Sequence, residues 1–233
     1  MDKIDIGHHI SQRYNEDLEN IRNRVLAMGG LVEKQLEDAI TALVKNDSQL
    51  AEQVINNDYK INALEVAIDE NCTQILARRQ PAASDLRLIV AIIKTITDLE
   101  RMGDEAEKIA RMAAQLSGME RGKEGYNEIE NLGDHVRRML HDTLDAFART
   151  DVDAAVKVAQ EDNKIDREYE ALMRQLMTYM MEDSRSIRRV LDLMWAARAL
   201  ERIGDHSSNM CEYIIYLVMG KDVRHTSLSD ITE

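Results

Sequence analysis

The sequence feature that most constrains the fold is an internal repeat. The segment LERMGD at Leu99–Asp104 returns as LERIGD at Leu200–Asp205, with five of six residues identical. Earlier in each copy, LEDAITALVKND at Leu36–Asp47 aligns with LHDTLDAFARTD at Leu140–Asp151. The copies are 104 residues apart in the earlier pair and 101 in the later one. Such self-similarity predicts that one supersecondary unit occurs twice in the chain.

Composition and periodicity predict that each unit is helical. Aromatic residues make up only 4% of the chain and Pro81 is its single proline, while apolar residues recur at helical spacing through long stretches. Polar breaks divide the chain into six predicted helices and lie at residues 45–49, 79–85, 117–125, 149–153 and 182–186. We expect Ser48–Arg79 to form one helix, about 48 Å long at 1.5 Å per residue.

The predicted fold is therefore all-α, with two tandem three-helix bundles related by internal duplication. We place the first unit at residues 1–118 and the second at 124–220, followed by a C-terminal tail at 221–233. The join falls in the longest and most polar break, SGMERGKEG, which contains three glycines.

Each copy of the repeated motif carries two carboxylates one helical turn apart. Glu100 and Asp104 share a helix face in the first copy, as Glu201 and Asp205 do in the second. Like charges at this spacing destabilise a helix unless a cation offsets them. The chain has 43 acidic residues, so a single pair of this kind can arise by chance and form a solvated face. Two pairs at equivalent positions instead indicate a functional constraint.

A preceding helix of each copy offers a second polar pair at the same spacing. These pairs are Asp58 with Asn62 in the first copy and Asp162 with Asp166 in the second. Four oxygen-bearing side chains from two antiparallel helices suit a hard or borderline cation, with water or phosphate completing its shell. The first set is the weaker one, because Asn62 stands where the second set has an acid.

Glycine and histidine add to this hypothesis in different ways. Gly103 and Gly204 both fall in the middle of a predicted helix, where glycine is less stable than alanine by about 0.5–1 kcal/mol. Close approach of a neighbouring helix or room for a bound ion can explain them, and the two explanations are compatible. His206 follows Asp205 directly and is expected on the surface. No glutamate precedes a histidine by three residues, which argues against a ferritin-like di-iron site.

Charge and the absence of sorting signals narrow the class of protein. The net charge of −13 disfavours nucleic acid as a ligand and favours cations or basic protein surfaces. Cys72 and Cys211 lie far apart without a CxxC motif, as in a reducing compartment. The N-terminus has no signal-peptide pattern, and no apolar run is long enough to span a bilayer. We expect a cytoplasmic protein.

Its thirteen methionines are expected mostly in the core, with an adaptable partner surface as the alternative.

Several longer segments carry a resemblance to a known family. They are LERMGD and LERIGD within the duplicated unit, RQPAASDLRLI at Arg79–Ile89 and LMTYMMEDSRSI at Leu176–Ile187. Together they closely resemble the PhoU family of phosphate-uptake regulators, and the likeness runs over nearly the whole chain. The resemblance implies a cytoplasmic, often dimeric regulator that restrains the phosphate-starvation response by linking a phosphate ABC transporter to a PhoR-type sensor kinase.

The resemblance also implies metal sites. Some members of the family bind multinuclear metal clusters through paired E(D)xxxD motifs, which in this chain fall on Glu100, Asp104, Glu201, Asp205, Asp162 and Asp166. Asp58 with Asn62 departs from that pattern. The expected ions are divalent or trivalent, among them Mg, Mn, Fe and Zn. The expected partners are the kinase, the transporter's ATPase subunit and a second copy of the chain, with membrane association only through partners.

Two other functions are compatible with the acidic pairs. One is an oxygen-ligated metalloenzyme, for instance a phosphatase with a two-metal clamp on phosphate. The sequence offers no histidine ligand or separate base for it, and it has no Gly-rich phosphate loop or nucleophile elbow. The other is a purely structural helical adaptor whose acids only solvate a face. We expect a non-enzymatic signalling adaptor with two acidic metal sites.

Overall fold

The computed structural model describes residues 12–79, 81–119 and 125–223, and all regular structure in these ranges is helical. The first half contains α1 (Gln12–Lys45), α2 (Ser48–Asn57), α3 (Tyr59–Arg79) and α4 (Ala83–Ser117). The second half contains α5 (Tyr126–Arg149), α6 (Val152–Glu182), a 3-10 turn at Ser184–Ser186 and α7 (Ile187–Met219). The first eleven residues of the predicted first unit and residues 224–233 of the predicted C-terminal tail lie outside the described residues.

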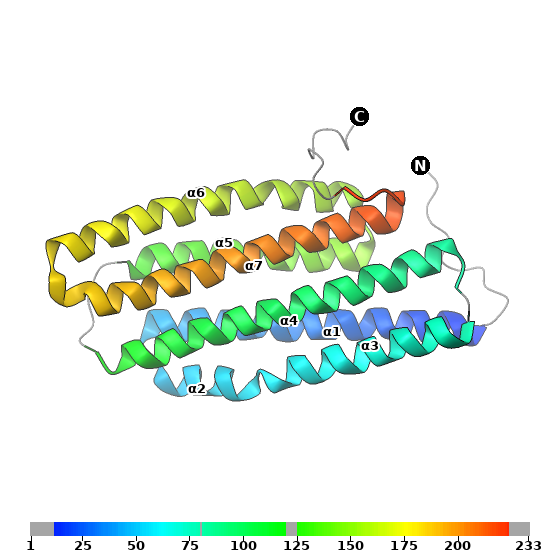
Figure 1. Cartoon of the computed structure of the whole chain (residues 1–233), viewed down its shortest axis with the longest axis horizontal. Helices are drawn as coiled ribbons and strands as arrows, with labels where there is room; N and C mark the ends of the chain where they lie inside the picture. Colours follow the sequence, from blue (N-terminus) through cyan, green and yellow to red (C-terminus); the bar gives the residue numbers. More distant parts are fainter. Residues whose placement is uncertain (1–11, 80, 120–124, 224–233) are drawn as a thin grey trace.

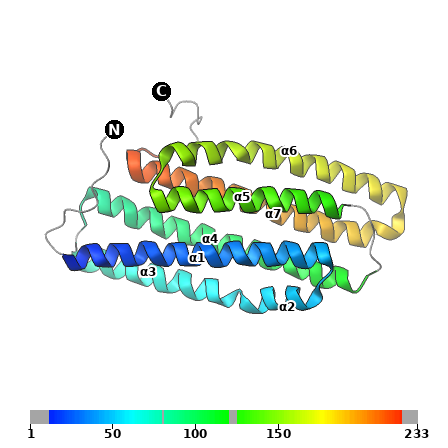
Figure 2. The same cartoon turned by 180° about the vertical axis from the view of Figure 1, so that it is seen from behind.

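The helices run roughly along the long axis of an elongated molecule, and the two halves lie side by side (Figures 1 and 2). α4 and α7 pack extensively against each other where the halves meet, and α1 also contacts α5. Buried apolar side chains from both halves form one continuous core. The all-α prediction is confirmed. Within the described part of the chain, no helix combines the length and apolar character that crossing a membrane requires.

The turns show that the duplication extends to backbone detail. α1 and α5 are followed at equivalent positions by residues with positive φ, Asn46 at 58° and Thr150 at 54°. Asp47 and Asp151 come next, and each accepts a hydrogen bond of 3.0 Å from the backbone N–H three residues ahead. A short carboxylate in this position satisfies an otherwise unpaired amide of the first helical turn. Both halves thus begin their next helix in the same way.

The prediction of one helix over Ser48–Arg79 is wrong. The segment is divided into α2 and α3 at Asp58, so the described residues form seven α-helices instead of six. No glycine or proline lies between Ser48 and Arg79. Asp58 is buried, and its side chain is held by Gln35 of α1. The equivalent Asp162 lies within the continuous α6, so the break belongs to the first half alone.

Candidate metal centre

The second half brings three of its four predicted ligands together. Asp166 of α6 and Glu201 and Asp205 of α7 each present a carboxylate oxygen, and these oxygens lie within 4.8 Å of one another. Glu201 is buried, whereas Asp166 is exposed at the edge of the cluster. The helical spacing of Glu201 and Asp205 aims both at α6, which packs against α7. We call Asp162, Asp166, Glu201 and Asp205 the second cluster.

The second cluster holds negative charge that its surroundings only partly offset. Burial, followed by the charge of Asp205, raises the pKa of Asp162 to about 6 and that of Glu201 to about 7. Arg198 Nη1 donates to Glu201 Oε1 at 2.5 Å. Among the described residues, the buried Glu201 Oε2 and Asp162 Oδ1 have no hydrogen-bond partner. Buried carboxylate oxygens without donors fit coordination of a cation, which would supply the missing charge.

The two mid-helix glycines provide clearance beside the clusters. A Cβ on Gly204 would lie 3.3 Å from Ile165 Cγ2 and 3.6 Å from Asp162 Oδ1. A Cβ on Gly103 would lie 3.0 Å from Ile61 Cδ1 and 3.4 Å from Asp58 Oδ1. Each glycine therefore lets the neighbouring helix and its first acidic residue approach the ExxxD motif. Of the two explanations expected from the sequence, close approach of a neighbouring helix applies at both glycines, and room for a bound ion stays a prediction.

The first cluster, formed by Asp58, Asn62, Glu100 and Asp104, is arranged differently. Gln35 Nε2 donates to Asp58 Oδ1 at 2.8 Å and to the carbonyl of Gly103 at 3.1 Å, and Asn62 Nδ2 donates to Asp58 Oδ2 at 3.2 Å. Both oxygens of Asp58 thus already accept hydrogen bonds. Burial and then neighbouring carboxylates raise the pKa of Glu100 and of Asp104. Within the described residues, only the second half brings three such ligands together.

A buried polar bridge that the sequence did not predict lies between the clusters. His206 is 7% exposed, and its Nδ1 lies 2.8 Å from Asp98 Oδ1 of α4. Beside it, Arg202 Nε contacts the buried Glu105 at 3.0 Å. The prediction that His206 is a surface residue is wrong, because α4 of the other half covers it. Each bridging residue is adjacent or close in sequence to an ExxxD motif. The sequence of one half, however, does not show which of its residues pack against the other half.

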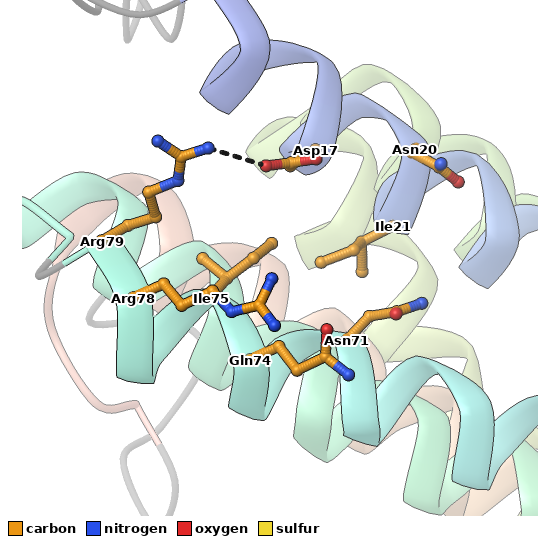
Figure 3. Close-up of a pocket in the computed structure, with 8 residues that line it drawn as sticks. All are labelled: Asp17, Asn20, Ile21, Asn71, Gln74, Ile75, Arg78 and Arg79. Atoms are coloured by element: carbon orange, nitrogen blue, oxygen red, sulfur yellow. Dashed lines mark ion pairs between the residues drawn. The ribbon is translucent and has the colours of Figure 1, made fainter.

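A separate polar hollow lies between α1 and α3, away from both clusters (Figure 3). Its volume is about 430 Å³, and one ion pair, Arg79 Nη2 to Asp17 Oδ2 at 3.6 Å, crosses it. Ile21 and Ile75 contribute its apolar surface. The other lining residues are Asn20, Asn71, Gln74 and Arg78. None of the predicted ligands lines this hollow, so the second cluster remains the better candidate site.

Comparison with known proteins places these features in a family. The PhoU domain matches the chain twice, at residues 25–113 and 129–214, once in each half. The chain belongs to the PhoU family. PhoU proteins are regulatory and accessory proteins, so the prediction that this chain is not an enzyme is confirmed. The repeat of the PhoU domain also confirms the predicted duplication.

Full-length relatives and solved structures of PhoU proteins agree with this assignment. A Pseudomonas putida protein described as a phosphate-specific transport system accessory protein PhoU homolog is 58% identical, covering 100% of this chain and 91% of its own length. The Escherichia coli K12 accessory protein PhoU is 53% identical over 97% of this chain and 93% of its own. The crystal structure of PhoU from Pseudomonas aeruginosa matches at a TM-score of 0.87 and 56% identity, covering 89% of this chain and 100% of that one.

Proposed function

We propose that the chain is a cytoplasmic negative regulator of the phosphate regulon that modulates phosphate uptake. It would couple a phosphate ABC transporter, through the ATPase subunit, to a PhoR-type sensor kinase, acting as a homodimer that reaches the membrane only through these partners. The observation that carries the proposal is similarity over the whole chain to phosphate-specific transport system accessory proteins. The net charge of −13 is consistent with protein partners and disfavours nucleic acid.

We further propose that the second cluster binds a divalent or trivalent cation. Asp166, Glu201 and Asp205 would supply the first ligands, and Asp162 a fourth. An all-oxygen donor set suits Mg²⁺ or Mn²⁺, and Fe or Zn ions accept carboxylates as well. When bound, the ion would neutralise the carboxylates and fix α6 against α7. The first cluster would bind a cation more weakly, because Asp58 is already engaged by two amides.

Calorimetric titration of the metal-stripped protein with Mn²⁺ and with Mg²⁺ tests the metal part of the proposal. Three double variants are compared with the wild type: Glu201→Ala/Asp205→Ala, Glu100→Ala/Asp104→Ala and, as a control, Glu130→Ala/Asp134→Ala. The control removes an exposed i,i+4 acidic pair from α5 and the same formal charge. We expect tight binding to be lost in the second-cluster variant and retained in the control. Equal affinity in the wild type and the second-cluster variant would contradict a metal site there.

A further inference from the structure

Exposed apolar side chains are concentrated at one end of the second half. Five of the ten large apolar side chains that are exposed among the described residues lie where α6 ends and α7 begins. We call these five the hairpin strip: Met177, Met181, Ile187, Leu191 and Trp195. Trp195 is the only tryptophan of the chain and is 66% exposed, and Met181 is 88% exposed. Single exposed apolar residues need no explanation, but a group on adjacent helices indicates a contact surface.

The residues of the hairpin strip on α7 are not part of the hydrophobic core. Ile187, Leu191 and Trp195 are four residues apart and so follow one face of the helix through two turns. The opposite face supplies Leu193 and Leu200 to the core, where both are 0% exposed. Core burial therefore explains one face of α7 and leaves the other unexplained. A ridge with this spacing is the kind of surface on which an amphipathic helix docks.

The hairpin strip leads directly into the second cluster. One turn after Trp195, Arg198 donates to Glu201, and its guanidinium lies 5.8 Å from the ring centroid of Tyr169 on α6. Arg198 thus contacts a predicted metal ligand and an aromatic side chain at the end of the strip. A cation that draws Glu201 into its shell would change the partner of Arg198 beside the docking surface.

The segment that carries the hairpin strip is less acidic than the rest of the molecule. Residues 172–198 contain five arginines and three acidic residues, a net charge of +2 in a chain of −13. Arg174 and Arg185 have side chains that are 69% and 90% exposed, and the acids that they pair with, Glu170 and Asp183, are 66% and 47% exposed. Ion pairs this exposed are weak, so the carboxylates of a partner can compete for these arginines. Exposed arginines bordering apolar residues favour a ligand that combines an apolar face with carboxylates. An anionic bilayer is a poorer match, because the acidic second cluster adjoins the strip and the molecule as a whole would be repelled.

We propose that the hairpin strip docks an acidic amphipathic helix of a signalling partner. The apolar face of that helix would cover Leu191 and Trp195, and its carboxylates would meet the surrounding arginines. Met177 and Met181 are flexible and adapt to an incoming surface. The proposal rests on the proposed function, since the partners to be tested are the sensor kinase and the transporter's ATPase subunit.

The single tryptophan makes the docking directly measurable. The cytoplasmic part of the kinase and the ATPase subunit, each made without tryptophan by phenylalanine substitution, are titrated separately into this protein, with and without Mn²⁺. Burial of Trp195 should shift its fluorescence to shorter wavelength with one of them. Leu191→Asp, which keeps the reporter, should weaken binding at least about tenfold, as central interface residues commonly do. Val66→Asp is the control, because Val66 is 57% exposed on α3 in the other half.

The outcomes separate this proposal from the function on which it rests. Hydrogen exchange on the bound partner should protect an acidic amphipathic helix. If the wild type binds a partner and Leu191→Asp binds equally well, the surface is wrong while the coupling function stands. If the wild type binds neither partner, the coupling function fails and the docking proposal fails with it. If anionic vesicles cause the fluorescence shift, the hairpin strip binds a membrane and the proposed partner helix is wrong. If a higher concentration of this protein alone causes the shift, the strip binds a second copy of the chain instead.

Discussion

At the scale of single residues, the ionised carboxylates of the second cluster lower the stability of the metal-free protein. Asp162 and Glu201 have oxygens that are buried without donors, and burial raises the pKa of both carboxyls. A carboxyl whose pKa is higher in the folded state holds its proton more tightly there than in the unfolded chain. Its contribution to stability is therefore present at low pH and is lost as the pH rises through the folded pKa.

The stability of the metal-free protein should therefore depend on pH. The unfolded pKa values are near 4, and the folded values are about 6 for Asp162 and about 7 for Glu201. The free energy of unfolding should fall between about pH 4.5 and pH 7.5 relative to Asp162→Asn/Glu201→Gln, which does not titrate at these positions. We expect a difference of about 1–2 kcal/mol, reduced from the full shifts by solvent screening. Urea denaturation in chelator measures it, and parallel pH profiles for the two proteins would contradict it.

At the scale of helices, Gln35 explains why the first half departs from the repeat. Its amide joins α1 to Asp58 and to the carbonyl of Gly103, and so ties three helical segments together. The equivalent residue 104 positions later is Met139, and the helix beside it, α6, runs unbroken past Asp162. The amide thus stabilises the carboxylate of the first cluster from within the protein, in the place where the second cluster is left without a donor.

We therefore predict that Gln35→Met destabilises the protein. Loss of a buried hydrogen bond to a charged group should lower the free energy of unfolding by about 1–3 kcal/mol at pH 7. Gln53→Met on α2 makes the same chemical change at an exposed position and should have an effect below about 0.5 kcal/mol. Denaturant titration of both variants checks this. If the two variants were equally stable, Gln35 would not be what holds Asp58.

The sequence predicted those features that depend on local periodicity. Helical spacing and polar breaks predicted the long helices. The repeated LER(M/I)GD segment located two of the three carboxylates that converge in the second half, and the polar pair on the preceding helix located the third, Asp166. The break at Asp58 was missed because nothing in the spacing of Ser48–Arg79 marks it, and the side chain that holds Asp58 belongs to Gln35, 23 residues away on another helix. The burial of His206 was missed for a similar reason, since its partner Asp98 is 108 residues away. Spacing within one helix carries no information about such contacts.

At the scale of the whole molecule, the two halves are joined by polar and charged residues next to their acidic motifs. Asp98 meets His206 and Glu105 meets Arg202 across the packed surfaces of α4 and α7. Asp98 precedes Glu100 by two residues and His206 follows Asp205, so each bridge starts from the backbone that also positions a cluster. The duplicated units therefore share a polar connection in addition to their common core. The helices that carry the two clusters, α4 and α7, are thus held to each other by side chains next to the clusters.

The proposed regulation of the phosphate-starvation response involves the whole molecule. Replacing Glu100, Asp104, Glu201 and Asp205 together by alanine should preserve the fold, because it removes like-charge pairs one turn apart and alanine favours helix. If cation binding is needed for signalling, a reporter of the phosphate-starvation response should stay on in abundant phosphate when this variant replaces the wild type, at normal protein abundance. Glu130→Ala/Asp134→Ala should repress normally. Full repression by the quadruple variant would show that regulation does not require the acidic clusters. The hairpin strip would then be the remaining candidate for the surface that carries the signal.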